Sequence, residues 1–108
     1  MNSKNIIEEI ITDITSKLAL YPSIYEIRLF GSQILRYSIE SDIDLAIFCK
    51  NNINYNKILK DIVECTERYH VLIHPVIYEK SINQLMENSY INENILQRSV
   101  ILYRNKNF

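Results

Sequence analysis

Segments with the apolar spacing of helices alternate with short runs of β-forming residues along most of this chain. The predicted helices cover about 4–19, 33–37, 55–69 and 81–98, and the last opens at a Ser-x-x-Gln capping box and breaks near 88–89. The predicted strands cover 24–30, 43–48 and 71–78, and a short extended piece covers 100–103. This order predicts an α/β (α+β) fold in which helices pack against one small mixed sheet.

Proline restricts where the third strand can lie in that sheet. Pro75 falls inside the segment 71–78 and has no backbone N–H to donate to a neighbouring strand. We therefore expect this strand to lie at an edge of the sheet or to carry a bulge.

The bulk properties bound the class of protein. The chain, residues 1–108, has the length of a single domain, and 47% hydrophobic residues supply a core that a disordered chain would lack. The net charge of -1 argues against a broad nucleic-acid-binding surface. Cys49 and Cys65 form no C-x-x-C motif, so we expect two buried thiols in a reducing compartment. No apolar run is long enough for a membrane span or a secretory signal, so we expect a cytoplasmic protein.

Gly31, the only glycine of the chain, directly follows the first predicted strand and precedes Ser32. Glycine at this point permits a positive φ angle and lets the backbone approach a ligand closely. The N–H groups of a following helical turn, together with the Ser32 hydroxyl, would favour an anion. The Gly-Ser dipeptide alone is also typical of an ordinary strand-to-helix turn.

Asp42 and Asp44 lie at the start of the second predicted strand. Strand alternation places both carboxylates on one face, with their Cα atoms roughly 6.5 to 7 Å apart. Two carboxylates so placed can reach one divalent cation, and Mg²⁺ prefers such oxygen ligands together with substrate phosphates. Asp-x-Asp alone is equally compatible with a solvated turn.

The combined pattern is more specific than either part. A strand is followed by Gly31-Ser32, nine residues, Asp42-Ile43-Asp44 and an apolar strand. This pattern resembles the nucleotidyltransferase superfamily related to DNA polymerase beta, and most closely its short bacterial and archaeal members, the minimal nucleotidyltransferases. A looser likeness extends over nearly the whole chain and includes His74-Pro75-Val76. The resemblance implies the nucleotidyltransferase fold.

The resemblance also implies roles for the motif residues. Gly31 and Ser32 would bind the β- and γ-phosphates of a nucleoside triphosphate, with ATP the expected substrate. Asp42 and Asp44 would hold Mg²⁺ and act in catalysis. Arg36 would be the basic residue that contacts the triphosphate, although an exposed arginine with no ligand is an equal alternative.

One departure from the family bears on catalysis. Active members add a third carboxylate from a later strand, and here the corresponding position is occupied by Leu72. His74 shares a face with Leu72 by strand alternation, so it would serve as a base or metal ligand. A partly buried histidine bonded to backbone or water is the structural alternative. Glu26 and Glu79 are weaker substitutes for the missing acid.

Two functions therefore stay open. The first is a transferase that moves AMP from ATP to a hydroxyl of a helical HEPN-type partner, because small relatives are often antitoxins paired with such a ribonuclease toxin. The second is a degenerate nucleotide-binding subunit that acts by binding its partner. A small RNA-binding domain fits the charge poorly. The isoleucine-rich first helix also leaves a homo-oligomer open.

Overall fold

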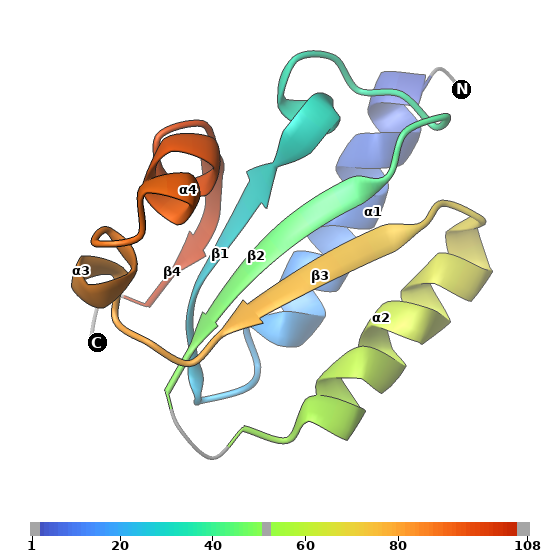
Figure 1. The fold of residues 1–108 in the computed structure, drawn as a ribbon. Coiled ribbons are helices and arrows are strands. Elements are labelled where there is room, and N and C mark those ends of the chain that lie inside the picture. The colour runs from blue at the N-terminus through green and yellow to red at the C-terminus, as the bar shows by residue number, and fades with distance from the viewer. Residues whose placement is uncertain (1–2, 51–52, 106–108) are drawn as a thin grey trace.

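The computed structural model describes residues 3–50 and 53–105 (Figure 1). In chain order its elements are α1 (Ser3–Leu18), β1 (Ile24–Phe30), the 3-10 turn η1 (Gly31–Ile34), β2 (Ile43–Cys49), α2 (Tyr55–Tyr69), β3 (Ile73–Tyr78), α3 (Ile82–Leu85), α4 (Ser89–Ile91), the π-helical turn η2 (Asn92–Leu96) and β4 (Val100–Arg104). This mixture of helices and one sheet confirms the predicted α/β (α+β) class.

Two predicted elements differ from the structure. The helix expected over 33–37 is instead the 3-10 turn η1, which begins at Gly31 and ends at Ile34. The chain leaves the helical path there because the Gln33 side chain hydrogen-bonds the backbone of Ser38 in place of a helical turn. The third strand begins at Ile73 rather than Val71, although the Leu72 carbonyl still accepts a hydrogen bond of 2.9 Å from the Ile43 N–H.

The four strands form one mixed sheet in the order β3-β2-β1-β4. Strand β1 runs antiparallel to β2 and to β4, whereas β2 and β3 are parallel and are joined through α2. A parallel pair needs such a crossover because its two strands start at the same edge of the sheet. Pro75 lies in β3, which pairs only with β2 among the described strands, so the predicted edge position is confirmed.

The two faces of the sheet are covered unequally (Figure 1). Helices α1 and α2 pack on one face and enclose the larger core, which includes the inward side chains of β2. We call the opposite surface the front face. The short elements α3, α4 and η2 cover part of it through a smaller apolar cluster. The large core accounts for the isoleucines of α1 that left an oligomer open, because four of the five are buried in it and Ile6 is partly buried against it.

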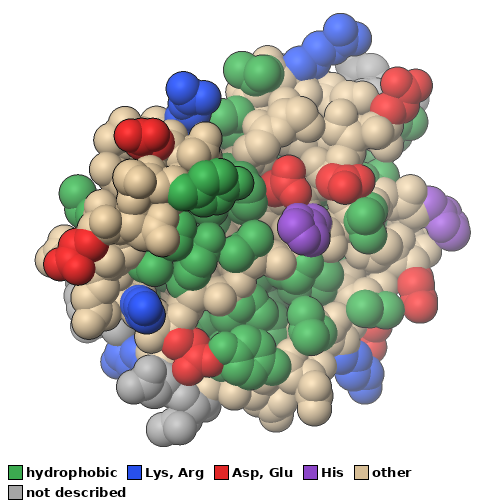
Figure 2. Space-filling model, viewed as in Figure 1, with side chains coloured by type: hydrophobic (Ala, Val, Ile, Leu, Met, Phe, Trp, Pro, Cys, Tyr) green, Lys and Arg blue, Asp and Glu red, His purple; other side chains and the backbone are tan. Residues whose placement is uncertain are grey.

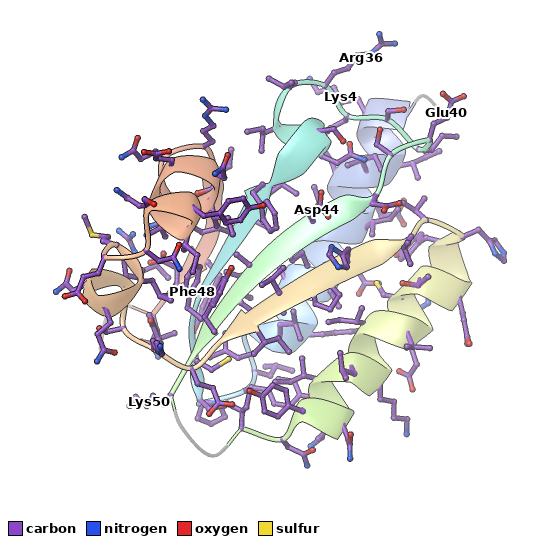
Figure 3. All side chains as sticks on the ribbon, viewed as in Figure 1. Lys4, Arg36, Glu40, Asp44, Phe48 and Lys50 are labelled. Carbon is purple, nitrogen blue, oxygen red and sulfur yellow. The ribbon has the colours of Figure 1, made fainter. Side chains whose placement is uncertain are left out.

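Strand alternation sorts the residues of β2 between these faces. Ile43, Leu45 and Ile47 are buried in the α1 and α2 core, and each such side chain contributes about 2 kcal/mol of hydrophobic stabilisation. Asp44 and Phe48 take the intervening positions and point to the front face (Figure 3). The apolar half of the strand thereby fixes which way Asp44 points.

Helix α2 ends in a way that returns the chain to the sheet. Its last carbonyl groups are capped by His70, which adopts a left-handed conformation with φ of 56° and donates its N–H to the Thr66 carbonyl at 2.8 Å. The chain then enters β3 beside β2, with His74 in register with Asp44. The helix terminus thus helps to set which β3 residue faces the Asp-x-Asp motif.

Cys49 and Cys65 are both buried and free, as predicted. Burial raises the pKa of the Cys49 thiol to about 12 and that of Cys65 to about 11, so both stay protonated at neutral pH. Across 3–50 and 53–105, the structure has no helix long and apolar enough to cross a bilayer.

Candidate active site

Gly31 directly follows β1 and lies beside β2. It has both expected properties, a positive φ angle and a close approach to another group. Its φ is +78°, a conformation that side chains disfavour. A Cβ atom at this position would lie 2.2 Å from Asp44 Oδ2. The register explains this contact, because Phe30, the last residue of β1, pairs with Asp44. Glycine is therefore required for the Asp44 carboxylate to lie against the turn.

The other oxygen of the same carboxylate meets His74. The two residues are neighbours in the parallel β2–β3 pair, and His74 Nδ1 lies 3.2 Å from Asp44 Oδ1. The Asp44 side chain is 23% exposed and that of His74 is 62% exposed. His74 is thus exposed rather than partly buried, and its hydrogen bond within the described ranges is to a side chain. The structure brings it into direct contact with the Asp-x-Asp motif.

The other two motif residues, Asp42 and Ser32, lie next in sequence to those just described, before β2 and in the η1 turn. Asp42 is exposed and directly precedes β2, two residues before Asp44. Ser32 is exposed in the η1 turn, next to Gly31. Figure 2 shows a histidine and two acidic side chains close together on this face, beside a gathering of hydrophobic side chains. The four motif residues therefore belong to one accessible region.

The charges of this region lack a basic counterpart. Within the described part of the chain, no lysine or arginine forms an ion pair with Asp42 or Asp44, and His74 is the single partner of Asp44. No group of three or more His, Cys, Asp or Glu side chains there is arranged to hold a metal ion. Two hard carboxylates fit Mg²⁺, provided that substrate phosphates supply further ligands. The residues suit a metal that arrives with a triphosphate.

Comparison with known families decides the assignment. The family described as polymerase beta, nucleotidyltransferase matches residues 12–108. The chain belongs to this family. The match covers both halves of the Gly-Ser and Asp-x-Asp pattern, as well as β3 and β4. A comparison with curated proteins gave no match.

Solved structures show the same fold at low sequence identity. The chain is similar to a toxin–antitoxin MntA-HepT structure, with a TM-score of 0.62 and 14% identity over 93% of this chain and 74% of that one. A toxin–antitoxin structure with AMP-PNP gives a TM-score of 0.57 and 16% identity, covering 99% and 77% of the two chains. A tri-AMPylated Shewanella oneidensis HEPN toxin in complex with MNT antitoxin gives 0.55 and 15%, covering 97% and 72%. These likenesses confirm the nucleotidyltransferase fold.

Neither substitute glutamate lies at the nucleotidyltransferase motif, so both suggestions were wrong. Glu26 is 1% exposed near the opposite end of β1, where its carboxylate accepts hydrogen bonds from Arg28 and Arg104. Glu79 follows the end of β3 and accepts a hydrogen bond from the Tyr55 hydroxyl. Glu26 is in register with Phe48, and Glu79 follows Tyr78, so both lie at the other end of β2 from Asp44. A pattern of acidic residues alone could not reveal this. Leu72 occupies the position where an acid was expected.

Arg36 lies beyond the η1 turn on another part of the surface. It is exposed, and in Figure 3 it projects from the outer end of the turn, away from Asp44. It lines an open hollow of about 720 Å³ together with Lys4 and Tyr37. The lining of this hollow includes none of Gly31, Ser32, Asp42, Asp44 and His74. A phosphate contact by Arg36 stays a prediction that would require its side chain to turn.

One buried residue of this region had no role in the sequence analysis. Gln33 is 1% exposed and belongs to the same turn as Gly31. Its side chain bonds backbone groups of Ser38 and Ser41. A buried amide needs such partners, but the sequence gives no sign that Gln33 is buried, because the segment around it has no clear periodicity.

Proposed function

We propose that this chain is a Mg²⁺-dependent nucleotidyltransferase that moves AMP from ATP to a hydroxyl group of a helical HEPN-type partner protein, and so acts as an antitoxin. One observation carries the proposal. The Asp44 carboxylate lies between Gly31 and His74, and Asp42 is exposed beside it. The turn after β1, the start of β2 and strand β3 thus bring together the groups that would bind phosphate, hold Mg²⁺ and act as a base.

The turn supports the binding of phosphate. Gly31 brings backbone close to the ligand region without a side chain, and the exposed Ser32 hydroxyl can donate to a phosphate oxygen. Asp42 and Asp44 would hold Mg²⁺, which when bound orients the phosphates and neutralises the charge of the departing pyrophosphate. Among the residues that the structure describes, neither carboxylate forms an ion pair with an arginine or lysine, which is consistent with this use.

His74 supports proton transfer. If its Nδ1–H donates to Asp44 Oδ1, the lone pair of Nε2 is available, and the side chain is 62% exposed. The acceptor hydroxyl oxygen would form a bond to the α-phosphorus while the bond from that phosphorus to the bridging oxygen breaks. The hydroxyl proton would pass to His74 Nε2, and pyrophosphate would leave with the electron pair of the broken bond.

The partner is proposed from the solved structures of similar fold. Their descriptions name MntA-HepT toxin–antitoxin pairs and a tri-AMPylated HEPN toxin with an MNT antitoxin. One is described with AMP-PNP, an ATP analogue. Family membership supports nucleotidyl transfer, and these descriptions support the choice of AMP and of a HEPN-type acceptor.

The first experiment is an incubation with Mg²⁺, ATP labelled on the α-phosphate, and a HEPN-type protein, taken from a neighbouring gene if one encodes it. We expect label on that protein and a mass increase equal to one AMP per event. Binding of ATP without any transfer would reject the transferase. ATP labelled on the γ-phosphate is the control, because it should leave no label on the acceptor.

A binding subunit without turnover is the second candidate. It is favoured by Leu72, which directly precedes β3 and occupies the position where the family resemblance led us to expect an acid. This candidate predicts that the chain neutralises its partner equally well with and without ATP. The transferase predicts that neutralisation requires ATP and persists after the two proteins are separated.

Substitution of His74 tests the base directly. We expect His74→Ala to lower the rate of AMP transfer about 100-fold or more, which is typical for loss of a general base, with little change in ATP affinity. His70→Ala is a matched control, because His70 is the other histidine and caps α2. Equal rates for His74→Ala and wild type would exclude His74 as the base.

A further inference from the structure

Gln33 is one of only two polar or charged side chains that are buried within the described ranges, the other being Glu26. Burial of an amide is unfavourable unless its N–H and C=O groups find partners. Glu26 has two arginine side chains for partners, whereas Gln33 has only backbone groups of the loop between η1 and β2. Gln33 therefore serves to hold that loop.

Three hydrogen bonds define what Gln33 holds. Its Nε2 donates to the Ser38 carbonyl at 2.7 Å and to the Ser41 carbonyl at 2.9 Å. Its Oε1 accepts the Ser38 N–H at 2.9 Å. Both N–H groups of the amide and its oxygen are thus used. Ser41, one of the bonded residues, directly precedes Asp42.

Asp42 depends on its backbone for its position. Its side chain is exposed and has no hydrogen bond to any other residue that the structure describes. On the following side, the Ile43 N–H is fixed to the Leu72 carbonyl of the neighbouring chain segment at 2.9 Å. On the preceding side, Ser41 is fixed through Gln33. The carboxylate is therefore held between two backbone anchors.

We propose that Gln33 is a positioning residue of the nucleotidyltransferase site, which sets the distance between the Gly31-Ser32 turn and the Asp42 carboxylate. This inference rests on the proposed function. Gln33 belongs to η1, the turn that contains Gly31 and Ser32, and it bonds the residue before Asp42. One amide thereby joins the segment proposed to bind phosphate to a proposed ligand of Mg²⁺. Loss of the amide should weaken the use of Mg²⁺ more than the contact with the nucleotide.

The test measures ATP binding by calorimetry as a function of Mg²⁺ concentration. Gln33→Met keeps the length of the side chain and removes all three hydrogen bonds. We expect the Mg²⁺ concentration for half-maximal ATP binding to rise about tenfold, as is typical when a group that orients a metal ligand is lost. At saturating Mg²⁺, ATP affinity should return to near the wild-type value.

Gln84→Met is the matched control. Gln84 also bonds backbone through its side chain, accepting the Ser81 N–H at 3.1 Å in the capping box of α3, but it is not among the residues around Asp44. We expect it to lower the unfolding temperature and leave the Mg²⁺ dependence unchanged. If Gln33→Met does the same, Gln33 supports the fold alone and the inference is overturned.

Two further outcomes separate this inference from the function on which it rests. If Gln33→Met does not fold, Gln33→Asn keeps the amide on a shorter side chain, and wild-type Mg²⁺ dependence in that variant would overturn the inference. If the wild type itself binds ATP without any dependence on Mg²⁺, the proposed function fails first. Wild-type binding that depends on Mg²⁺, together with the tenfold rise in Gln33→Met, supports both.

Discussion

Two carboxylates lie near opposite ends of strand β1, Glu26 on β1 itself and Asp44 on the neighbouring β2, and their surroundings differ. Near its start, Glu26 is buried and its two oxygens accept hydrogen bonds from Arg28 at 2.5 Å and Arg104 at 2.6 Å. Arg28 is in turn tied to the Leu96 carbonyl at 3.0 Å. Near its end, Asp44 of the neighbouring strand lies against Gly31, and its polar side-chain partner in the described part of the chain is His74.

The contrast separates a carboxylate that supports the fold from two that we propose to bind a metal ion. A buried charge is retained in a stable fold only when opposite charges and hydrogen bonds compensate for its lost hydration, as at Glu26. Asp42 and Asp44 have no arginine or lysine partner in the described portion, yet they are kept together and accessible. Negative charge left in this state is suited to a cation that arrives with a ligand.

The largest effect is expected at Asp42 and Asp44, whose carboxylates lack a basic partner in the described part of the chain. Asp42→Asn combined with Asp44→Asn should reduce Mg²⁺-dependent ATP binding by more than about 100-fold. Loss of a residue that only orients a metal ligand lowers metal affinity by up to about 100-fold, and loss of the ligands themselves should lower it further. The free energy of unfolding should change by less than about 1 kcal/mol, since no stabilising arginine or lysine pair is broken. Calorimetry measures the ATP affinity, and chemical denaturation measures the free energy of unfolding. Unchanged ATP affinity would remove the metal site from the proposal.

At Glu26, whose carboxylate is paired with arginines, we expect a loss of stability instead. Glu26→Gln keeps the shape of the side chain and leaves Arg28, whose side chain is only 11% exposed, without its counter-charge. We therefore expect a loss of about 3 kcal/mol in the free energy of unfolding. This loss is at the low end of the range for breaking a buried ion pair, because the second partner, Arg104, is 54% exposed and can be solvated. Glu87→Gln, at an exposed position, is the control. Equal denaturation midpoints for the two variants would show that the pairing at Glu26 contributes no stability.

The smallest effect concerns the contact between Gly31 and Asp44. Gly31→Ala should cost about 2 kcal/mol, from the left-handed conformation and from a Cβ placed against the carboxylate. In an Asp44→Ala background the cost should fall to about 1 kcal/mol, because only the conformational part remains. These two substitutions, alone and combined, form a double-mutant cycle, and the free energy of unfolding of each variant is measured with denaturant in the absence of nucleotide. Additive costs would mean that Asp44 moves aside freely and is not held by the turn.

Much of the architecture could be predicted from the sequence because the apolar spacing was clear where elements are long. The bounds of β1 and α2 agree with the prediction, and Pro75 correctly predicted an edge strand. The turn after Gly31 was predicted less well. A helix was expected over 33–37, but the bonds of one buried side chain, Gln33, end the turn at Ile34. Local propensity contains no information about a side chain that becomes buried only after folding.

A Gly-Ser turn and an Asp-x-Asp strand in a small α/β domain could be predicted from the sequence alone, because glycine conformation and strand alternation are local properties. Which groups meet at this turn depends on how the strands pair. The parallel register of β2 and β3 placed His74, and not Leu72, in register with Asp44. The antiparallel register of β1 and β2 placed the Asp44 carboxylate against Gly31, and Glu26 among arginines at the other end. Register depends on how all strands and helices pack together, so no single segment of sequence contains it.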